Sequence, residues 1–189
     1  MTSSALLDLA NTVLPRLAAE HGASISYRPS GLFDLMKIVD NRPTTLECKS
    51  KSIYAMADLQ RWARSYQVDF ASPFWQGIDF AELSRGVLVA LDDGREADYV
   101  NAVCPAVHGR PTDLGQRSEL IGVLNKAGFD GARLLDQAKS APYAARLDKC
   151  TEAAAQRGVF GSPTMFVGGE MFFGNDRLDF MAETLRSAA

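Results

Sequence analysis

The sequence has no long hydrophobic run and no excess of positive charge. Its longest uninterrupted apolar stretch is Val87 to Leu91, whereas a membrane-spanning helix needs about 20 apolar residues. The formal net charge is −3 and the sequence pI is about 5.4, which argues against a nucleic-acid binder because such domains are usually basic. The first residues lack the basic segment of a secretory signal, and Asp8 interrupts the apolar residues there. We therefore expect a cytoplasmic protein that binds neither membranes nor nucleic acid.

Cysteine and histidine are too few and too scattered for the common metal or redox motifs. The three cysteines, Cys48, Cys104 and Cys150, include no C-x-x-C pair, and neither histidine, His21 or His108, stands at a ligand spacing. This pattern argues against a disulfide framework, a metal site and a dithiol redox centre. Reduced thiols in a cytoplasm are the simplest interpretation.

Helical periodicity runs through most of the 189 residues. The composition suits one domain with its own core, since 47% of the residues are hydrophobic and 23% are charged. Between the first two helical segments, Ile25 to Arg28 alternates like a strand, and Pro29-Ser30-Gly31 ends it. The expected helices cover about residues 4–21, 32–39, 45–66, 80–91, 96–107, 115–127, 131–140 and 141–157.

The last thirty or so residues change character. Pro163 to Val167 and Glu170 to Phe173 are β-like, and Gly168-Gly169 between them suits a two-residue hairpin. Gly174-Asn175-Asp176 then opens a final helix. This order resembles an α/β, thioredoxin-like fold with a large all-helical insertion, as in DsbA-like proteins. The thioredoxin-like part would comprise about residues 1–40 and 158–189, and the insertion about 41–157.

The most specific stretch is Gly158 to Phe166 together with Phe173 to Leu178. It resembles the C-terminal signature of 2-hydroxychromene-2-carboxylate isomerases and of the related kappa-class glutathione transferases. The resemblance implies a cis bond before Pro163 and a glutathione site in which the backbone of Ser162 pairs with the cysteinyl part.

The resemblance also implies that Asp176 and Arg177 hold the γ-glutamyl end of glutathione. Physical chemistry agrees, because a helix N-terminus attracts a carboxylate and an aspartate can receive an ammonium group. An ordinary helix cap at Asn175 and Asp176 is the alternative.

A second stretch, Asn41 to Thr45 followed by Asp58 to Ala63, is similar to the family's loop and helix. The resemblance implies that Asn41 positions cofactor and substrate, although Thr45 is an alternative equivalent. Lys49 and Tyr54 are candidate substrate-binding residues, since a cation near the site suits a carboxylate substrate. A solvated helix face is the competing interpretation for Lys49 and Lys51.

The third stretch is the N-terminus, where the family has a strand and then a Ser-Pro-aromatic turn. Alignment places Ser4 at the catalytic serine that donates a hydrogen bond to the glutathione sulfur. Ala5 and Leu6 stand where the family has proline and an aromatic residue, so a plain helix cap is the alternative for Ser4. Further along, Phe70, Phe74 and Trp75 are candidates to wall a pocket for a flat aromatic substrate, or to pack in the core.

The resemblance implies a glutathione-dependent isomerase that interconverts 2-hydroxychromene-2-carboxylate and the open-chain hydroxybenzylidenepyruvate in aromatic hydrocarbon catabolism. Its partners would be glutathione, a small aromatic carboxylate and a second copy in a homodimer. A kappa-like glutathione transferase and a non-catalytic homologue that binds a ligand or partner are the alternatives. Because the first helix leaves no residues for the family's first strand, and unpaired strand edges are costly, we also expect a rearranged or dimer-supported sheet.

Overall fold

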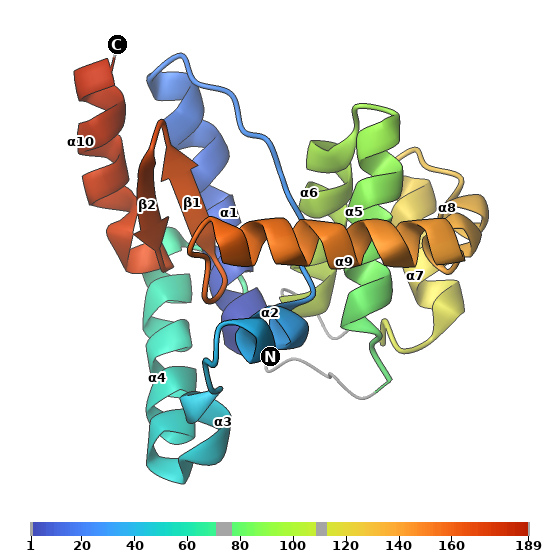
Figure 1. Cartoon of the computed structure of the whole chain (residues 1–189), viewed down its shortest axis with the longest axis horizontal. Coiled ribbons are helices and arrows are strands. Elements are labelled where there is room, and N and C mark those ends of the chain that lie inside the picture. The colour runs from blue at the N-terminus through green and yellow to red at the C-terminus, as the bar shows by residue number, and fades with distance from the viewer. Residues whose placement is uncertain (1, 71–76, 109–112, 189) are drawn as a thin grey trace.

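Two groups of elements lie side by side in the computed structural model, which describes residues 2–70, 77–108 and 113–188 (Figure 1). At residues 2–5, 46 and 188 it describes the backbone only. The elements are α1 (Thr2–Glu20), α2 (Leu32–Ile38), α3 (Thr44–Glu47), α4 (Lys49–Tyr66), α5 (Phe80–Asp92), α6 (Glu96–His108), α7 (Arg117–Lys126), α8 (Gly131–Ala138), α9 (Ala141–Gln156), β1 (Thr164–Val167), β2 (Glu170–Phe173), the 3₁₀ helix η1 (Asn175–Arg177) and α10 (Leu178–Ala188).

The first group contains α1, α4, α10 and the hairpin, and the second contains α5 to α8, with α9 running across the front (Figure 1). Helix α9 packs on α2, α5 and α8, and α1 contacts α4, α6, α10 and η1. Helix α1 therefore touches both groups. No helix within the described ranges is long and apolar enough to cross a bilayer.

The predicted hairpin is confirmed. Strands β1 and β2 pair antiparallel with Thr164 opposite Phe173 and Val167 opposite Glu170. Gly168 in the turn has φ +59°, which a two-residue hairpin requires. The Ser162–Pro163 bond is cis, as predicted. One face of the hairpin packs against α1 and α10. The shared core contains Ala10, Leu14, Phe172, Leu178 and Met181.

The predicted strand at Ile25 to Arg28 is wrong. The segment is extended, and its residues alternate between half-buried and exposed, but the sheet found in the described residues contains β1 and β2 alone. Period-two alternation reports which side of an extended chain faces inward, whereas a ladder also needs a neighbouring strand. The segment does not slide across to the hairpin, so a rearranged sheet is contradicted; support by a second copy stays a prediction.

The single helix predicted over residues 45–66 is also wrong, because it is divided at Cys48. That residue has φ −107° and ψ 110°, so it ends α3 and precedes the first residue of α4. Helix α4 then packs on α1 through Leu59 and Ala63, which lie against Leu9. One extended residue changes the direction of the chain without disturbing the apolar spacing on either side, and periodicity therefore missed the break.

A polar seam joins α1 to α6. It consists of Asp8 and Asn11 on α1, Asn101 and His108 on α6, and Tyr27 from the extended segment. The Asp8 carboxylate contacts Nδ1 of His108. Asn11 Nδ2 donates to Asn101 Oδ1 at 2.9 Å, and the Tyr27 hydroxyl donates to Asn11 Oδ1 at 2.5 Å. No local pattern predicts this pairing, because Asp8 and His108 stand 100 positions apart.

Burial governs the titration of the groups in and around the seam. It raises the pKa of the Asp8 carboxyl, although the neighbouring His108 opposes the shift. It also raises the pKa of the Cys104 thiol well above its ordinary value and that of the Tyr27 hydroxyl to about 12. Cys104 and Tyr27 therefore remain uncharged near neutral pH, which leaves the Asp8 carboxyl as the acidic group of the seam.

The core of the second group depends on a close approach between α5 and α6. Tyr99 is 1% exposed and its hydroxyl donates to the Leu83 carbonyl at 3.0 Å. Its ring lies directly on Gly86, where an added Cβ would come within 2.8 Å of Tyr99 Cε2 and closer still to the hydroxyl. Only glycine lets α6 approach α5 this closely.

Replacing this glycine should disrupt the second group. We expect Gly86→Ala to lower the free energy of unfolding by about 1–3 kcal/mol, because the buried ring has no space to move into. Gly122→Ala in α7 is the matched control: nothing lies within 4 Å of its added Cβ, so the helix preference of alanine should raise stability by about 0.5–1 kcal/mol. Urea unfolding measures both, and equal effects would contradict the predicted overlap.

Because the pKa of Asp8 is raised, we expect the stability of the protein to depend on pH through this group. The folded state retains the Asp8 proton above the ordinary pKa of 3.8, so the stability from this group is complete below pH 3.8 and is lost as pH rises through the raised folded pKa. Asp8→Asn cannot lose a proton, so it should gain stability relative to wild type as pH rises from about 4 towards 7. Urea midpoints over that range measure the difference.

Asp92→Asn serves as a control of opposite sign. Hydrogen bonds from Arg146 and Tyr143 lower the pKa of Asp92, so its stabilising effect is present above pH 3.8 and is lost as pH falls through the lowered pKa. The stability of Asp8→Asn relative to wild type should therefore rise with pH above about pH 4. The stability of Asp92→Asn relative to wild type should instead fall as pH rises below about pH 4. A flat curve for Asp8→Asn would show that the folded state does not desolvate this carboxylate.

Candidate functional site

The loop before the cis proline is tightly built. Pro163 is fully buried. The Phe173 ring covers Gly161 so closely that an added Cβ there would lie 2.8 Å from its Cε2 atom. Thr164 Oγ1 donates to the Gly161 carbonyl at 2.8 Å, and Gly174 N donates to the Pro163 carbonyl at 3.0 Å. These contacts hold the backbone on both sides of Ser162.

Ser162 has polar backbone groups available for a ligand. Its N–H and C=O make no hydrogen bond to any residue that the structure describes, while the residues around it are fixed. Such a segment can form backbone hydrogen bonds with an extended peptide-like molecule. The sequence prediction that Ser162 pairs with the cysteinyl part of glutathione is compatible with this geometry.

Asn41 lies beside the same loop. Its Nδ2 donates to the Phe160 carbonyl at 2.8 Å, and its Oδ1 accepts from Arg42 N at 2.8 Å. The side chain thereby joins the loop between α2 and α3 to the loop that precedes Ser162. Asn41 is thus joined, across 119 positions, to a residue that precedes Ser162 by two, and its amide orients the loop. Thr45, the alternative, lies in α3.

Asp176 and Arg177 begin the last helical segment, as predicted. Their side chains are about half exposed, with Arg177 Nη1 2.5 Å from Asp176 Oδ2. Asp176 folds back over Gly174, whose φ of +93° and lack of a Cβ make room for the carboxylate. The two charges together match a zwitterionic group, because the aspartate can receive an ammonium and the arginine a carboxylate.

Asn175, next to this pair, was not among the predicted site residues. Its side chain is 3% exposed, and its Nδ2 finds no hydrogen-bond partner in the described part of the chain. Its backbone carbonyl accepts from the Tyr66 hydroxyl at 3.4 Å. A buried amide donor without a partner is costly and is often satisfied by a ligand or water. The only sequence signal was the cap-like Gly-Asn-Asp string, which favours a structural role.

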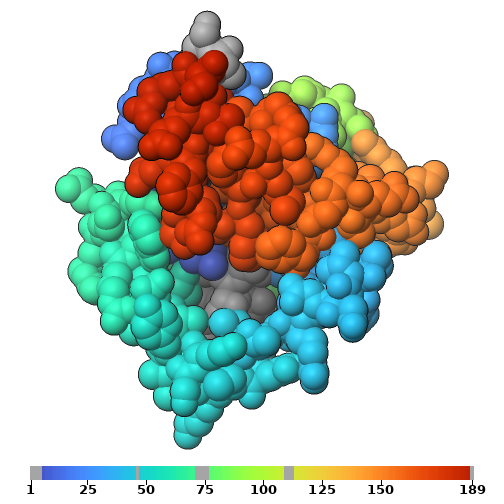
Figure 2. Space-filling model, turned by 60° about the vertical axis from the view of Figure 1, so that its left-hand side comes forward, coloured from blue at the N-terminus to red at the C-terminus, as the bar shows by residue number. Residues whose placement is uncertain are grey.

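Lys49 and Tyr54 lie on α4. Figure 2 shows α3 and α4 below and beside the hairpin and the end of α9 on the same face of the molecule. Lys49 is exposed and Tyr54 is 63% exposed. The Arg61 guanidinium lies 5.5 Å from the Tyr54 ring centroid. Among the described residues, no hydrogen bond or ring contact joins Lys49 or Tyr54 to the proline loop, so their role in substrate binding stays a prediction.

Three predicted site residues, Ser4, Phe74 and Trp75, have side chains outside the described part of the structure. Ser4 lies in the first turns of α1, and only its backbone is described. Phe74 and Trp75 lie outside the described residues, and their predicted role stays a prediction. Phe70, by contrast, packs against Leu9 and its neighbours and stacks on His108, which favours the core alternative for that residue.

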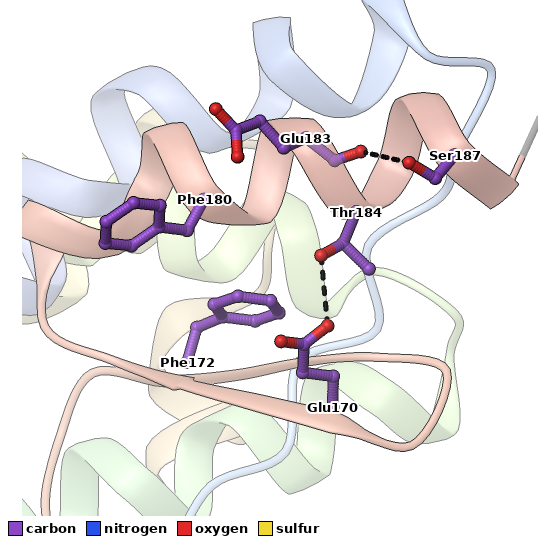
Figure 3. A pocket seen from close by; sticks show the side chains of 6 residues that line it. All are labelled: Glu170, Phe172, Phe180, Glu183, Thr184 and Ser187. Atoms are coloured by element: carbon purple, nitrogen blue, oxygen red, sulfur yellow. Dashed lines mark hydrogen bonds between the residues drawn. The ribbon is translucent and has the colours of Figure 1, made fainter.

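A hollow lies between β2 and α10 (Figure 3). Its volume is about 530 Å³, and it is lined by Glu170, Phe172, Phe180, Glu183, Thr184 and Ser187. Thr184 Oγ1 donates to Glu170 Oε2 at 3.0 Å. The lining contains two carboxylates and no cation, which is unsuited to an anionic ligand, and it includes none of the predicted residues. The candidate site is therefore the constellation around Ser162.

Metal chemistry has no support in the described part of the chain. There, no group of three or more histidine, cysteine, aspartate or glutamate side chains is placed to hold a metal ion. The candidate site instead offers backbone hydrogen-bonding groups, one amide side chain and an acid–base charge pair, which together suit a small peptide.

Comparison with known proteins gives consistent matches. Residues 8–186 match the family described as the DSBA-like thioredoxin domain. The chain is 33% identical over 178 residues to a 2-hydroxychromene-2-carboxylate isomerase of Sphingobium xenophagum, covering 94% of this chain and 90% of that protein. It is 35% identical over 177 residues to the protein of that name in Pseudomonas putida, covering 93% and 86%.

Two further matches extend the comparison. Glutathione S-transferase kappa 1 of Homo sapiens is 27% identical over 183 residues, covering 86% of this chain and 77% of that protein. The solved structure of a 2-hydroxychromene-2-carboxylate isomerase superposes with a TM-score of 0.86 at 33% identity, covering 99% of this chain and 91% of that one. The chain therefore belongs to the DSBA-like thioredoxin family and, within it, to the 2-hydroxychromene-2-carboxylate isomerases that its C-terminal segment resembles.

Proposed function

We propose that the protein is a glutathione-dependent isomerase that interconverts 2-hydroxychromene-2-carboxylate and the open-chain hydroxybenzylidenepyruvate. The observation that carries the proposal is the meeting of Asn41 and the Ser162–Pro163 loop beside the Asp176–Arg177 pair. These residues come from separate parts of the chain, and their groups together would suit a tripeptide. Family membership supplies the substrate class, a small aromatic carboxylate that would be met in aromatic hydrocarbon catabolism.

The residues at the site fit glutathione group by group. The Ser162 backbone would form hydrogen bonds with the cysteinyl part, as an added extended segment does. Asp176 would receive the γ-glutamyl ammonium, and Arg177 with the Asn175 amide would receive its carboxylate. The buried Nδ2 of Asn175 supports this placement, because such a ligand would satisfy a donor that has no partner within the described residues.

Glutathione would supply a thiolate that adds reversibly to the conjugated system of the substrate and is released unchanged. The chain would contribute positioning and charge. Ser4 would donate a hydrogen bond to the sulfur beside the positive end of α1, and Lys49 would pair with the substrate carboxylate. Asn41 and Tyr54 would orient the substrate, and Phe74 and Trp75 would wall the pocket. We place the protein in the cytoplasm as a homodimer.

A kappa-like glutathione transferase is the second candidate, favoured by the match to glutathione S-transferase kappa 1. The two candidates differ in the fate of glutathione. An isomerase returns it after each turnover, whereas a transferase consumes one glutathione for each product.

The proposed activity can be tested with 2-hydroxychromene-2-carboxylate and a small amount of glutathione. We expect the spectrum of the substrate to approach the same equilibrium mixture from either isomer, with free thiol unchanged at the end. Stoichiometric loss of thiol would favour the transferase. Titration calorimetry that finds no binding at millimolar glutathione would contradict both glutathione-dependent candidates.

The Asp176–Arg177 pair gives a sharper prediction. Asp176→Ala and Arg177→Ala should each weaken glutathione binding about tenfold or more, because a hydrogen bond to a charged group is typically worth about 1.5–3 kcal/mol. Arg186→Ala, which removes the same charge from exposed surface on α10, should leave the affinity unchanged. Calorimetry compares the three variants. Equal affinities throughout would place the γ-glutamyl group elsewhere without contradicting the isomerase.

A further inference from the structure

The Asp8–His108 end of the polar seam lies close to the start of α1. Asp8 follows Ser4 by four positions, so the two residues lie on the same face of the helix one turn apart. The side chains of His108 and Asp8 are only 2% and 11% exposed. Their neighbours on α1, Leu9 and Ala10, are 1% and 0% exposed. A carboxyl–imidazole pair is thus enclosed among side chains that are otherwise apolar.

The imidazole of His108 contacts Asp8 through its Nδ1 edge and Phe70 through its ring face. The Phe70 ring stacks on it with centroids 5.8 Å apart and an interplanar angle of 7°. The Phe70 backbone is in turn fixed by Gln60 on α4, whose Nε2 donates to the Phe70 carbonyl at 3.3 Å. Three elements, α1, α6 and the segment after α4, therefore orient one ring.

Such a contact constrains α1 more strictly than the apolar core does. Apolar side chains tolerate small slides and rotations, whereas a buried pair that loses its hydrogen bond leaves an unsatisfied charge. Asp8–His108 therefore defines the height and rotation of the first turns of α1 against α6. The other titratable groups around the seam, Cys104 on α6 and Tyr27 on the extended segment, are neutral near pH 7 because burial raises the pKa of both.

We infer that Asp8 and His108 are positioning residues of the proposed isomerase, which fix the turn of α1 that carries Ser4. The inference rests on the proposed function, because it assigns the pair to the step in which the glutathione sulfur is held as a thiolate. Positions of reacting groups matter at this scale: a misplacement of about 1 Å can lower a rate about a hundredfold. The pair touches neither cofactor nor substrate and acts through α1.

The test compares two ends of the same seam. His108→Ala removes the contact nearest Ser4. His108→Asn is the conservative variant, because an asparagine amide can donate from nearly the position of Nδ1. Asn101→Ala is the matched control: it removes a part-buried hydrogen bond between the same two helices, but one that reaches α1 at Asn11, further from the first turn. All three variants are assayed as full-length protein with glutathione and 2-hydroxychromene-2-carboxylate.

We expect His108→Ala to lower kcat about tenfold or more, with little change in KM, and to raise the thiol pKa of bound glutathione, followed by thiolate absorbance against pH. His108→Asn should recover most of both losses. Asn101→Ala should reduce stability while leaving kcat and the thiol pKa unchanged. Hydrogen exchange at the amides of residues 6–9 should accelerate in His108→Ala and not in Asn101→Ala.

Several results would overturn the inference. If His108→Ala and Asn101→Ala lower kcat equally and leave the thiol pKa unchanged, the pair is merely structural, and the isomerase still stands. If wild type shows no glutathione-dependent isomerisation, the proposed function fails, and hydrogen exchange alone decides: equal exchange at residues 6–9 in both variants rejects the positioning role. Should His108→Ala fail to fold, Asp8→Ala, which removes the same contact from the α1 side, takes its place in each comparison.

Discussion

The burial of helix α1 is the constraint on which the rest of the structure depends. A sheet of two short strands, β1 and β2, cannot by itself join two groups of helices. Helix α1 performs that role, since it contacts α4, α10 and η1 in one group and α6 in the other. Leu9 and Ala10 are almost completely enclosed, and the polar seam gives this apolar contact a defined register. Both groups of elements are therefore placed by reference to one helix.

The candidate site lies where short local structures meet around that helix. The hairpin supplies the rigid backbone on either side of Ser162, and η1 supplies the Asp176–Arg177 pair. Asn41 joins a distant loop to the same place through the Phe160 carbonyl. Each contribution is modest, yet a peptide ligand needs several weak, correctly spaced groups more than it needs a deep cavity. This accounts for the contrast with the 530 Å³ hollow between β2 and α10, which has volume without matching chemistry.

The ion pairs of the protein differ in exposure, and their roles differ accordingly. The exposed ion pairs, such as Arg42–Glu47 and Arg61–Asp58, add little to stability because water screens them. The Asp8–His108 pair is enclosed, so the protonation of Asp8 is coupled to folding. The Asp176–Arg177 pair lies between these cases: it is half exposed, and a ligand can therefore reach both charges without first unfolding the surrounding backbone.

The sequence by itself determined the local structures. Helical periodicity located most helices to within a few residues, Gly168-Gly169 determined the hairpin turn, and the string around Ser162-Pro163 carried the family resemblance together with the cis bond. These features succeed because they depend on neighbours within a few positions, where propensity and turn geometry decide. The candidate site residues near the C-terminus were also predicted from such a local string of residues.

Only the tertiary structure decided what depends on distant partners. Ile25 to Arg28 has the alternation of a strand but no strand beside it, and the helix divides at Cys48 because α4 must pack along α1. His108 looked isolated until folding brought Asp8 against it across 100 positions. Pairing of this kind is chosen by the geometry of the whole chain, since a side chain carries no local mark of which remote group will satisfy it once water is excluded.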